Sequence, residues 1–179
     1  DGGAKTSAID NRRWAGKLRP SMRQLHRAGE KLVVDFSGKK PHIVDRRTGE
    51  LVEVELFVGA LGASCLTYAE ATASQKLHEW VGAHERMLEY FGGSTAVWVP
   101  DQLRSAIVQP CRYEPGVNRS YQEMAEHYGA VVIPARPGKA RDKAKVETMV
   151  LVAQRWILAR LRKRTFFDIV ELNAAIREL

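Results

Sequence analysis

The stretch that decides the fold is Lys31-Leu32-Val33-Val34-Asp35-Phe36-Ser37-Gly38. Its apolar, β-rich residues predict a buried strand over residues 31–37, and Gly38 marks the end of that strand. Asp35 stands inside this run, where an unpaired and desolvated carboxylate costs on the order of several kcal/mol. Asp35 therefore either caps a turn or binds a cation, and the second alternative requires further acidic residues elsewhere in the chain.

The composition is typical of a soluble globular protein with one domain and attached segments. The chain has 179 residues, of which 45% are hydrophobic and 27% charged, enough to bury a substantial core. No apolar run approaches the roughly 18 residues that span a bilayer, and no signal peptide opens the sequence. Cys65 and Cys111 form no CxxC pair, which argues against a zinc site and favours a reducing cytoplasm. Because the chain lacks an initiator Met, we expect a longer parent protein.

Positive charge is concentrated in two parts of the sequence, and the net charge is +7. Residues 1–31 hold eight Lys/Arg against three acidic residues, and residues 136–164 hold ten against two, a local charge of +8. Residues 48–91 hold two basic and seven acidic residues and would repel a polyanion. This distribution favours a nucleic acid over a membrane surface as partner, since no basic amphipathic helix with an aromatic anchor face stands out.

The order of predicted elements indicates a mixed α/β sheet of five strands flanked by helices. The early strands have short connections, which favour an antiparallel meander; they are expected over residues 31–37, 51–61 and 65–71, with a short strand at 42–44. A helix over residues 74–90 is expected to be capped by Ser74 and closed by Gly92-Gly93. The rest of the chain predicts a strand (95–99), an irregular segment (102–116), a helix (119–128), a strand (130–133) and two helices (142–162 and 167–179). In such βαβ units the later strands run parallel to the first.

The chain divides into three predicted parts. Residues 1–29 are polar and basic and are expected to form a linker or arm. Residues 30–163 form the predicted core. Residues 164–179 form a C-terminal helix that leads out of the core, and this helix either closes the domain or links it to a C-terminal region.

Three carboxylates are predicted to meet at one edge of this sheet. Asp35 lies near the end of the first strand, and Asp101 follows the strand that comes after the first crossover helix. Glu147 lies on the flank of the 142–162 helix, beside its inward apolar stripe. Ligands in such sheets gather at the carboxyl ends of parallel strands. Carboxylate oxygens are suited to Mg²⁺ or Mn²⁺, and two such ions support phosphoryl displacement.

Other polar residues have plainer interpretations. The cluster of Lys139, Arg141, Lys143 and Lys145 either forms a solvated face or contacts DNA phosphates, and its place before Glu147 favours phosphates. Asp142 is expected to cap its helix and Asp45 to belong to a turn. His84 and His127 are interpreted as packing or surface residues. The tryptophans expected in the core are Trp80, Trp98 and Trp156.

Three motifs of the sequence resemble those of DDE transposases, most closely the IstA-type insertion-sequence transposases. They are Val-Val-Asp35-Phe-Ser-Gly38, Val-Pro100-Asp101-Gln-Leu-Arg, and Arg136-Pro-Gly-Lys-Ala-Arg-Asp-Lys-Ala-Lys-Val-Glu147. The resemblance covers residues 20–179 and departs from the family at Gln102, where the family usually has Asn.

The resemblance implies an RNase H-like fold and a catalytic triad of Asp35, Asp101 and Glu147 that holds two Mg²⁺ ions. It implies hydrolysis at transposon ends to free a 3′-OH, followed by strand transfer into target DNA. It also implies an IstB-type AAA+ ATPase helper, a homo-oligomer assembled on DNA, and a place at the bacterial nucleoid. Two alternatives remain open: a non-catalytic RNase H-like module for DNA binding or assembly, and another integrase or nuclease on the same fold.

Overall fold

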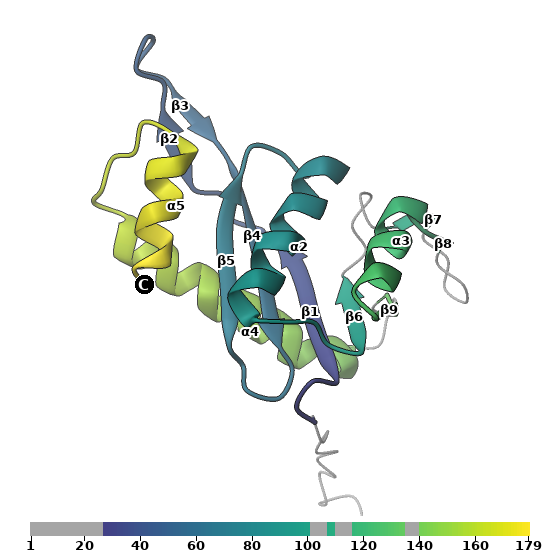
Figure 1. Ribbon diagram of the computed structural model, residues 1–179. Helices are drawn as coiled ribbons and strands as arrows, with labels where there is room; N and C mark the ends of the chain where they lie inside the picture. The colour runs from purple at the N-terminus through teal and green to yellow at the C-terminus, as the bar shows by residue number, and fades with distance from the viewer. Residues whose placement is uncertain (1–26, 101–106, 110–115, 135–139) are drawn as a thin grey trace, which may run out of the picture.

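The fold is built on a mixed five-stranded sheet with the strand order β5-β4-β1-β6-β9 (Figure 1). The computed structural model describes residues 27–100, 107–109, 116–134 and 140–179, with side chains described over 27–100, 118–134 and 148–179. The strands are β1 (Lys31–Phe36), β4 (Glu55–Leu61), β5 (Thr67–Thr72), β6 (Val97–Pro100) and β9 (Val131–Val132). β1 pairs antiparallel with β4 and parallel with β6, and β6 pairs parallel with β9. The predicted mixed sheet, an antiparallel meander continued by parallel strands, is therefore confirmed.

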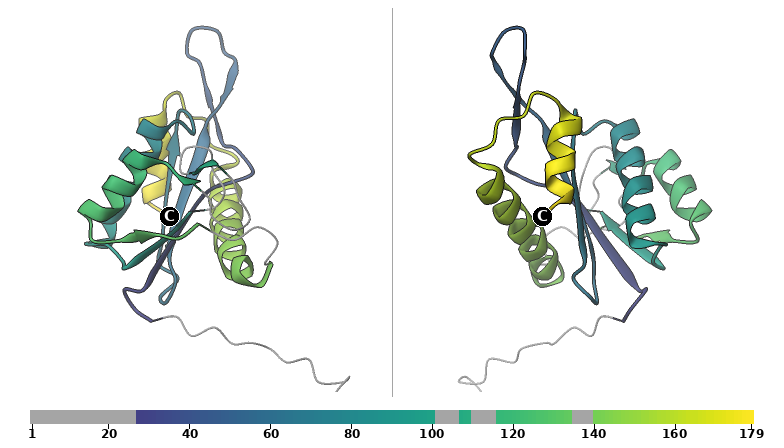
Figure 2. Two further views of the ribbon diagram at one scale, coloured as in Figure 1. Left: turned by 90° about the vertical axis from the view of Figure 1, so that its right-hand side faces the viewer. Right: turned by 60° about the vertical axis from the view of Figure 1, so that its left-hand side comes forward.

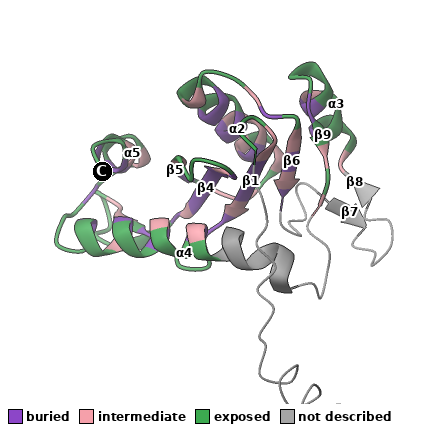
Figure 3. Cartoon of the chain, turned by 90° about the horizontal axis from the view of Figure 1, so that it is seen from below, coloured by how far each residue is buried: buried purple, intermediate pink, exposed green. Residues whose placement is uncertain are grey.

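Helices cover both faces of the sheet (Figure 3). The first face carries α2 (Leu77–Phe91) and α3 (Arg119–His127), and the second carries α4 (Ala140–Leu161) and α5 (Ile169–Arg177). Two short hairpins complete the described elements: β2 (His42–Val44) with β3 (Leu51–Glu53), and β7 (Ile107–Gln109) with β8 (Gly116–Val117). The β2–β3 hairpin projects beyond the sheet on the side of α5 (Figure 2). Within the described residues, no helix is both long and apolar enough to cross a membrane.

The first face of the sheet is covered by an aromatic core. Alternate residues of β1 point toward α2, because successive strand residues face opposite sides of the sheet. Phe36 packs edge-on against Phe57 of β4 and also contacts Trp80 of α2. Trp98 of β6 and Tyr121 of α3 are fully buried in the same cluster. The crossover helix α2 is thus held to the strands on both sides of β1, as the predicted core positions of Trp80 and Trp98 require.

His84 lies at the centre of this core with no exposed surface. Its Nδ1 is 2.8 Å from the carbonyl oxygen of Trp80, and its Nε2 is 3.0 Å from the hydroxyl of Tyr121. These contacts fit a neutral ring in which Nδ1–H donates to Trp80 and Nε2 accepts from Tyr121. Burial lowers the pKa of His84 to about 3. The expected packing role of His84 is confirmed, and His127 is exposed at the surface.

The second face is covered by aliphatic residues of α4 and α5. Leu56 and Val58 of β4 share a cluster with Val150 and Ile157 of α4. From α5, Leu172, Ala175 and Ile176 join the same cluster. The side-chain amide of Asn173 also accepts from the Ala71 N–H (2.6 Å) and donates to the Ala71 carbonyl (2.9 Å), which satisfies part of the free edge of β5. The boundary at residue 164 stays a prediction, but the C-terminal helix packs on the sheet.

The segment expected as one strand over residues 51–61 forms two strands, β3 and β4, separated at Val54. The division arises because β3 pairs with β2 in a separate hairpin, whereas β4 is an interior strand of the main sheet between β5 and β1. Leu56, Phe57 and Val58 are consequently all buried, whereas Val52 is exposed. The helix expected from Ser74 begins at Leu77, since the Ser74 hydroxyl accepts from the Lys76 N–H in the preceding turn.

Four further sequence predictions concern the end of α2, the segment 102–116, and two residues of α4. Gly92 ends α2 in the left-handed conformation (φ 72°), as predicted. Residues 102–116, expected to be irregular, contain β7 and the start of β8. Helix α4 begins at Ala140, so Asp142 lies inside the helix and not at its cap. Trp156 is 48% exposed because the inward stripe of α4 runs through its neighbour Ile157; its ring instead carries the Arg160 guanidinium, 4.3 Å from the ring centroid.

The buried, neutral His84 predicts that stability decreases on acidification. Below pH 6.5 the unfolded chain binds a proton at this ring that the folded chain does not bind until about pH 3. The free energy of unfolding should therefore fall by about 1.4 kcal/mol per pH unit below pH 6.5 from this group. Urea unfolding of the wild type and His84→Gln at pH 7, 6 and 5 measures the difference between their slopes. An exposed control, His127→Gln, should keep the wild-type slope, and equal slopes for His84→Gln would contradict the expectation.

Candidate active site

Asp35 lies on β1, one residue before the end of the strand. Its neighbours Val34 and Phe36 belong to the core beneath α2, so Asp35 takes the opposite side of the strand, which faces the α4 layer. The backbone of Asp35 is in register with Val58 of β4, which packs in the α4 cluster. Asp35 is half-buried, and its Oδ1 accepts from the Phe36 N–H at 2.8 Å. An acidic side chain therefore opens toward the second face at the end of the central strand.

The end of β6 lies beside the end of β1. The two strands run parallel, with Val34 in register with Pro100, the last residue of β6. The expectation that these strands are parallel neighbours, with their carboxyl ends at one sheet edge, is confirmed. Asp101 follows Pro100 in the sequence and lies outside the described residues. Its role as a ligand stays a prediction.

A hydrogen bond joins the end of β1 to α4. The Ser37 hydroxyl donates to Oε1 of Gln154 at 2.6 Å, and both side chains are buried. The same oxygen lies 3.4 Å from the backbone N of Lys39. Farther along both segments, the Val44 N–H donates to the Phe166 carbonyl at 2.8 Å. Residues 37–44 and 154–166 therefore advance in the same general direction, and Figure 1 shows α4 crossing behind the sheet at an angle to β1.

Glu147 lies within α4, and its side chain is outside the described side chains. Gln154 follows it by seven residues, which is close to two full helical turns, so both positions occupy one side of α4. The same limit applies to the predicted phosphate-binding residues. Arg141, Lys143 and Lys145 lie in the first turns of α4 with undescribed side chains, and Lys139 lies outside the described residues.

Asp45 belongs to a turn, as expected. Its Oδ1 accepts from the N–H groups of Arg47 (2.7 Å) and Thr48 (3.2 Å) at the tip of the β2–β3 hairpin. Among the side chains that the structure describes, no group of three or more His, Cys, Asp or Glu residues lies close enough to hold a metal ion. Two of the three predicted ligands fall outside that set, so the metal site stays a prediction.

A buried ion pair that the sequence did not indicate ties β5 to α2. Glu70 is 2% exposed and binds the Arg86 guanidinium through two contacts of 2.8 and 2.7 Å. The Tyr68 hydroxyl donates to the same carboxylate at 2.8 Å. Burial, together with this hydrogen bond, raises the pKa of Tyr68 well above its ordinary value. The Glu70 carboxylate thus accepts hydrogen bonds from both Arg86 and Tyr68. These three side chains form a structural link between strand β5 and helix α2.

A cavity of about 840 Å³ lies on the other side of α4, away from Asp35. It is lined by residues of β5, α2, α4 and α5, among them Tyr68, Tyr90, Trp156 and Arg177. Asp35, the one predicted acidic ligand whose side chain the structure describes, does not line it. The cavity and the sheet edge that carries Asp35 are therefore separate features.

The sequence is similar to proteins named as transposases. A Sinorhizobium fredii protein is 48% identical over 168 residues, which are 94% of this chain and 33% of that protein. A protein named for insertion sequence IS1162 of Pseudomonas fluorescens is also 48% identical, over 94% of this chain and 30% of its own length. The transposase for insertion sequence IS21 of Pseudomonas aeruginosa is 27% identical over 64% of this chain and 30% of its own length. The chain thus spans about a third of these relatives. No family model matches it.

Solved structures with the same fold are catalytic cores of retroviral integrases. The bovine immunodeficiency virus core has a TM-score of 0.54 at 9% sequence identity and covers 82% of both chains. The HTLV-2 core, solved with magnesium, has a TM-score of 0.57 at 12% identity and covers 87% of this chain and 84% of that one. The fold is therefore RNase H-like, as the resemblance implied.

The contact between Ser37 and Gln154 is expected to stabilise the position of α4. Loss of either side chain removes this hydrogen bond, while the Lys39 backbone remains a partner of the other group. Ser37→Ala and Gln154→Ala should each lower the free energy of unfolding by about 0.5–1.5 kcal/mol. In a double-mutant cycle measured by urea unfolding, the two effects should couple by about 1 kcal/mol. Additive effects would contradict a direct contact; the exposed pair Arg119→Ala and Glu123→Ala should show a weaker coupling.

Proposed function

We propose that this chain is the catalytic domain of an IstA-type DNA transposase, with Asp35, Asp101 and Glu147 as its catalytic acids. The parallel pairing of β1 with β6 carries the proposal, because it brings the ends of both strands to one edge of an RNase H-like sheet. The relatives named as insertion-sequence transposases support the choice of substrate, which is DNA. The relative named for IS21 supports the narrower assignment to the IstA type.

The contacts of α4 support the inclusion of Glu147. Gln154 touches Ser37, two residues beyond Asp35, and Glu147 precedes Gln154 by two turns on the same side of the helix. The chain segments that follow the Ser37–Gln154 contact advance in the same general direction. Moving from this contact toward the N-terminus therefore leads to Asp35 on β1 and to Glu147 on α4. The step back to Glu147 is about 10.5 Å along α4, and the step back to Asp35 is about 6.6 Å along the strand. The two carboxylate side chains are proposed to span the difference of about 4 Å.

The chemistry of these residues fits a divalent cation. Asp35 is half-buried at a strand end, so its carboxylate is held by a rigid element and keeps access to solvent. Three carboxylates supply the oxygen ligands that Mg²⁺ and Mn²⁺ prefer. We propose that Asp35, Asp101 and Glu147 hold two Mg²⁺ ions, for which Mn²⁺ substitutes. Such ions stabilise the charge that develops on a phosphodiester during in-line displacement.

The reaction proposed at these acids has two stages. Water attacks the phosphorus at a transposon end, the P–O3′ bond breaks, and the departing oxygen gains a proton to become a free 3′-OH. That 3′-OH then attacks a phosphodiester of target DNA, so one P–O bond forms as another breaks. Asp35 on β1, Asp101 after β6 and Glu147 on α4 are proposed to fix the geometry of both displacements. Gln102 follows Asp101 where the resembled family usually has Asn, and its longer side chain is proposed to alter the surroundings of that ligand.

The partners of the whole protein are also part of the proposal. Because the chain spans about a third of its relatives, the remaining two thirds hold room for end recognition. We propose that the complete protein assembles as a homo-oligomer on paired DNA ends, acts with an IstB-type AAA+ ATPase, and works in the bacterial cytoplasm at the nucleoid. The phosphate contacts of Lys139, Arg141, Lys143 and Lys145 belong to the same proposal.

Removal of any catalytic acid is expected to abolish the chemistry. Asp35→Asn, Asp101→Asn and Glu147→Gln should each lower Mg²⁺-dependent cleavage and joining of transposon-end DNA by at least about 100-fold, because each removes one ligand charge. Gel assays with the complete transposase and with this domain measure both steps. Asp45→Asn, in the hairpin turn, is the matched control and should keep full activity. Activity in an acid variant would remove that residue from the site, and inactivity of the wild type with intact DNA binding would favour a non-catalytic module.

Metal binding is expected to depend on the same acids. Titration of Mn²⁺, followed by the loss of its free electron paramagnetic resonance signal, should detect binding to the wild-type domain. Asp35→Asn should weaken that binding at least about tenfold, while Asp45→Asn should leave it unchanged. Equal Mn²⁺ binding by wild type and Asp35→Asn would contradict the assignment of Asp35 as a ligand.

A further inference from the structure

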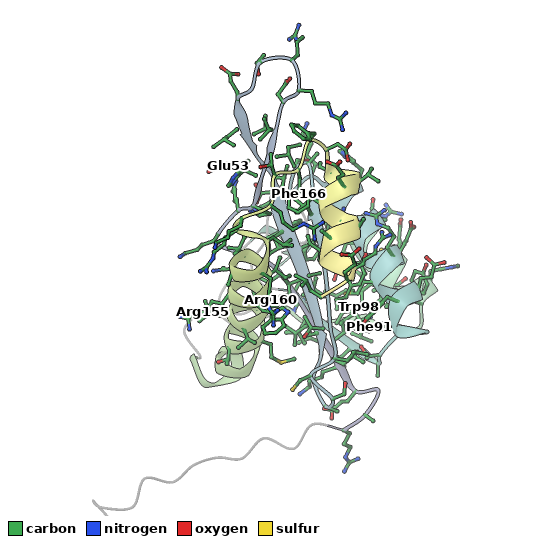
Figure 4. The ribbon with its side chains drawn as sticks, turned by 90° about the vertical axis from the view of Figure 1, so that its left-hand side faces the viewer. Glu53, Phe91, Trp98, Arg155, Arg160 and Phe166 are labelled. Atoms are coloured by element: carbon green, nitrogen blue, oxygen red, sulfur yellow. The ribbon has the colours of Figure 1, made fainter. Side chains whose placement is uncertain are left out.

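The described half of α4 presents cations on two different sides. Val150, Ile157 and Leu161 face the core, so the remaining sides of the helix are open to solvent. Arg160 turns toward Trp156 and the large cavity. Arg155 of α4 and Arg162, in the turn directly after the helix, are both exposed. Figure 4 shows Arg155 at the outer margin of the molecule and Arg160 on a different side of α4.

The side that carries Arg155 adjoins the end of β1. Gln154, its neighbour in sequence, binds the Ser37 hydroxyl and lies 3.4 Å from the backbone N of Lys39. The exposed residues Lys39 and Arg155 therefore flank the same buried contact. Arg162 lies farther along the chain, in the turn that follows the end of α4 at Leu161. We call Lys39, Arg155 and Arg162 the outer strip.

The cations of the outer strip are free of acidic partners among the described residues. Three nearby cations instead lie close to acids: Lys40 to Glu55, Arg46 to Asp168 and Glu171, and Arg164 to Glu178. A plain solvated surface usually mixes both signs of charge. The outer strip instead has a positive charge of three along a line that starts beside the proposed catalytic edge.

We propose that the outer strip binds the sugar–phosphate backbone of double-stranded DNA on its way to or from the catalytic edge. This inference rests on the proposed function and adds a contact surface to it. Arg and Lys bind phosphate oxygens through charge-assisted hydrogen bonds. The helical rise from Arg155 to the end of α4 at Leu161 is about 9 Å, which corresponds to nearly three phosphates of one strand at 3.4 Å each. Such contacts position DNA without reading its sequence.

Salt dependence of DNA binding tests the outer strip directly. Each lost phosphate contact lowers the slope of log K against log salt by about 0.9 and, at 0.1 M salt, weakens binding roughly five- to tenfold. Arg155→Gln and Arg162→Gln should each show this change, and the double variant should show about twice the change in slope. The assay is fluorescence anisotropy of a labelled 30-base-pair duplex of arbitrary sequence over a series of KCl concentrations. The domain is used as the full 179-residue chain.

Arg160→Gln is the matched control, because it removes the same charge from the same helix on the cavity side. It should leave the slope within about 0.3 of the wild type. If all three single variants shift the slope equally, general electrostatics explains the effect and the outer strip is overturned. If Arg155→Gln and Arg162→Gln leave slope and affinity unchanged, it is overturned as well. All three side chains are exposed, so melting temperatures should match the wild type and confirm that each variant folds.

The catalytic proposal and the outer strip fail in distinguishable ways. Asp35→Asn should bind the duplex with the wild-type salt slope and lack cleavage. If Asp35→Asn cleaves normally while the arginine variants bind weakly, the proposed catalytic acids are wrong and the outer strip stands. If Asp35→Asn is inactive while the arginine variants bind normally, the outer strip is wrong and the catalytic acids stand.

Discussion

The parallel pairing of β1 with β6 is the constraint on which the rest of the structure depends. Two parallel neighbours require a crossover between them, and α2 supplies it across the first face of the sheet. That crossover is stabilised by an aromatic core in which Trp80, Trp98 and Tyr121 are completely buried. The same pairing leaves the carboxyl ends of both strands at one edge. The pairing of β1 with β6 thus sets both the need for the packed crossover helix α2 and the position of the candidate site.

The position of Asp35 explains how an acidic residue is tolerated in the central strand. β1 has neighbours on both sides and helices on both faces, so most of its residues are buried. Asp35 lies at the penultimate position and is half-buried, which spares its carboxylate the full cost of desolvation. The next residue on that face, Ser37, is buried and hydrogen-bonded to Gln154. The polar end of β1 therefore continues directly into the contact that positions α4.

The sequence was sufficient for features set by local pattern and insufficient for those set by distant contacts. Strand β1, its parallel relation to β6 and the Gly92 stop of α2 follow from short-range signals: an apolar run, a crossover and a left-handed glycine. The division of residues 51–61 into β3 and β4 depends on pairing with other strands, which the local sequence of this segment does not show. Trp156 was expected in the core on hydrophobicity alone, although the helical stripe passes through Ile157. The Ser37–Gln154 contact spans 117 residues and has no local signature.

In the proposed function, the distribution of charge over α4 serves an acidic site that takes an anionic substrate. Carboxylates at the β1–β6 edge repel phosphates, so a polyanion reaches them only if cations close by offset that repulsion. Cations paired with acids give little attraction, which sets Lys40, Arg46 and Arg164 apart from Arg155 and Arg162. The acidic residues of the chain concentrate over 48–91, where Glu70 is enclosed by Arg86 and Tyr68. Exposed positive charge thus remains at Arg155, on the side of α4 that adjoins the end of β1, and the proposed function uses this charge to attract DNA.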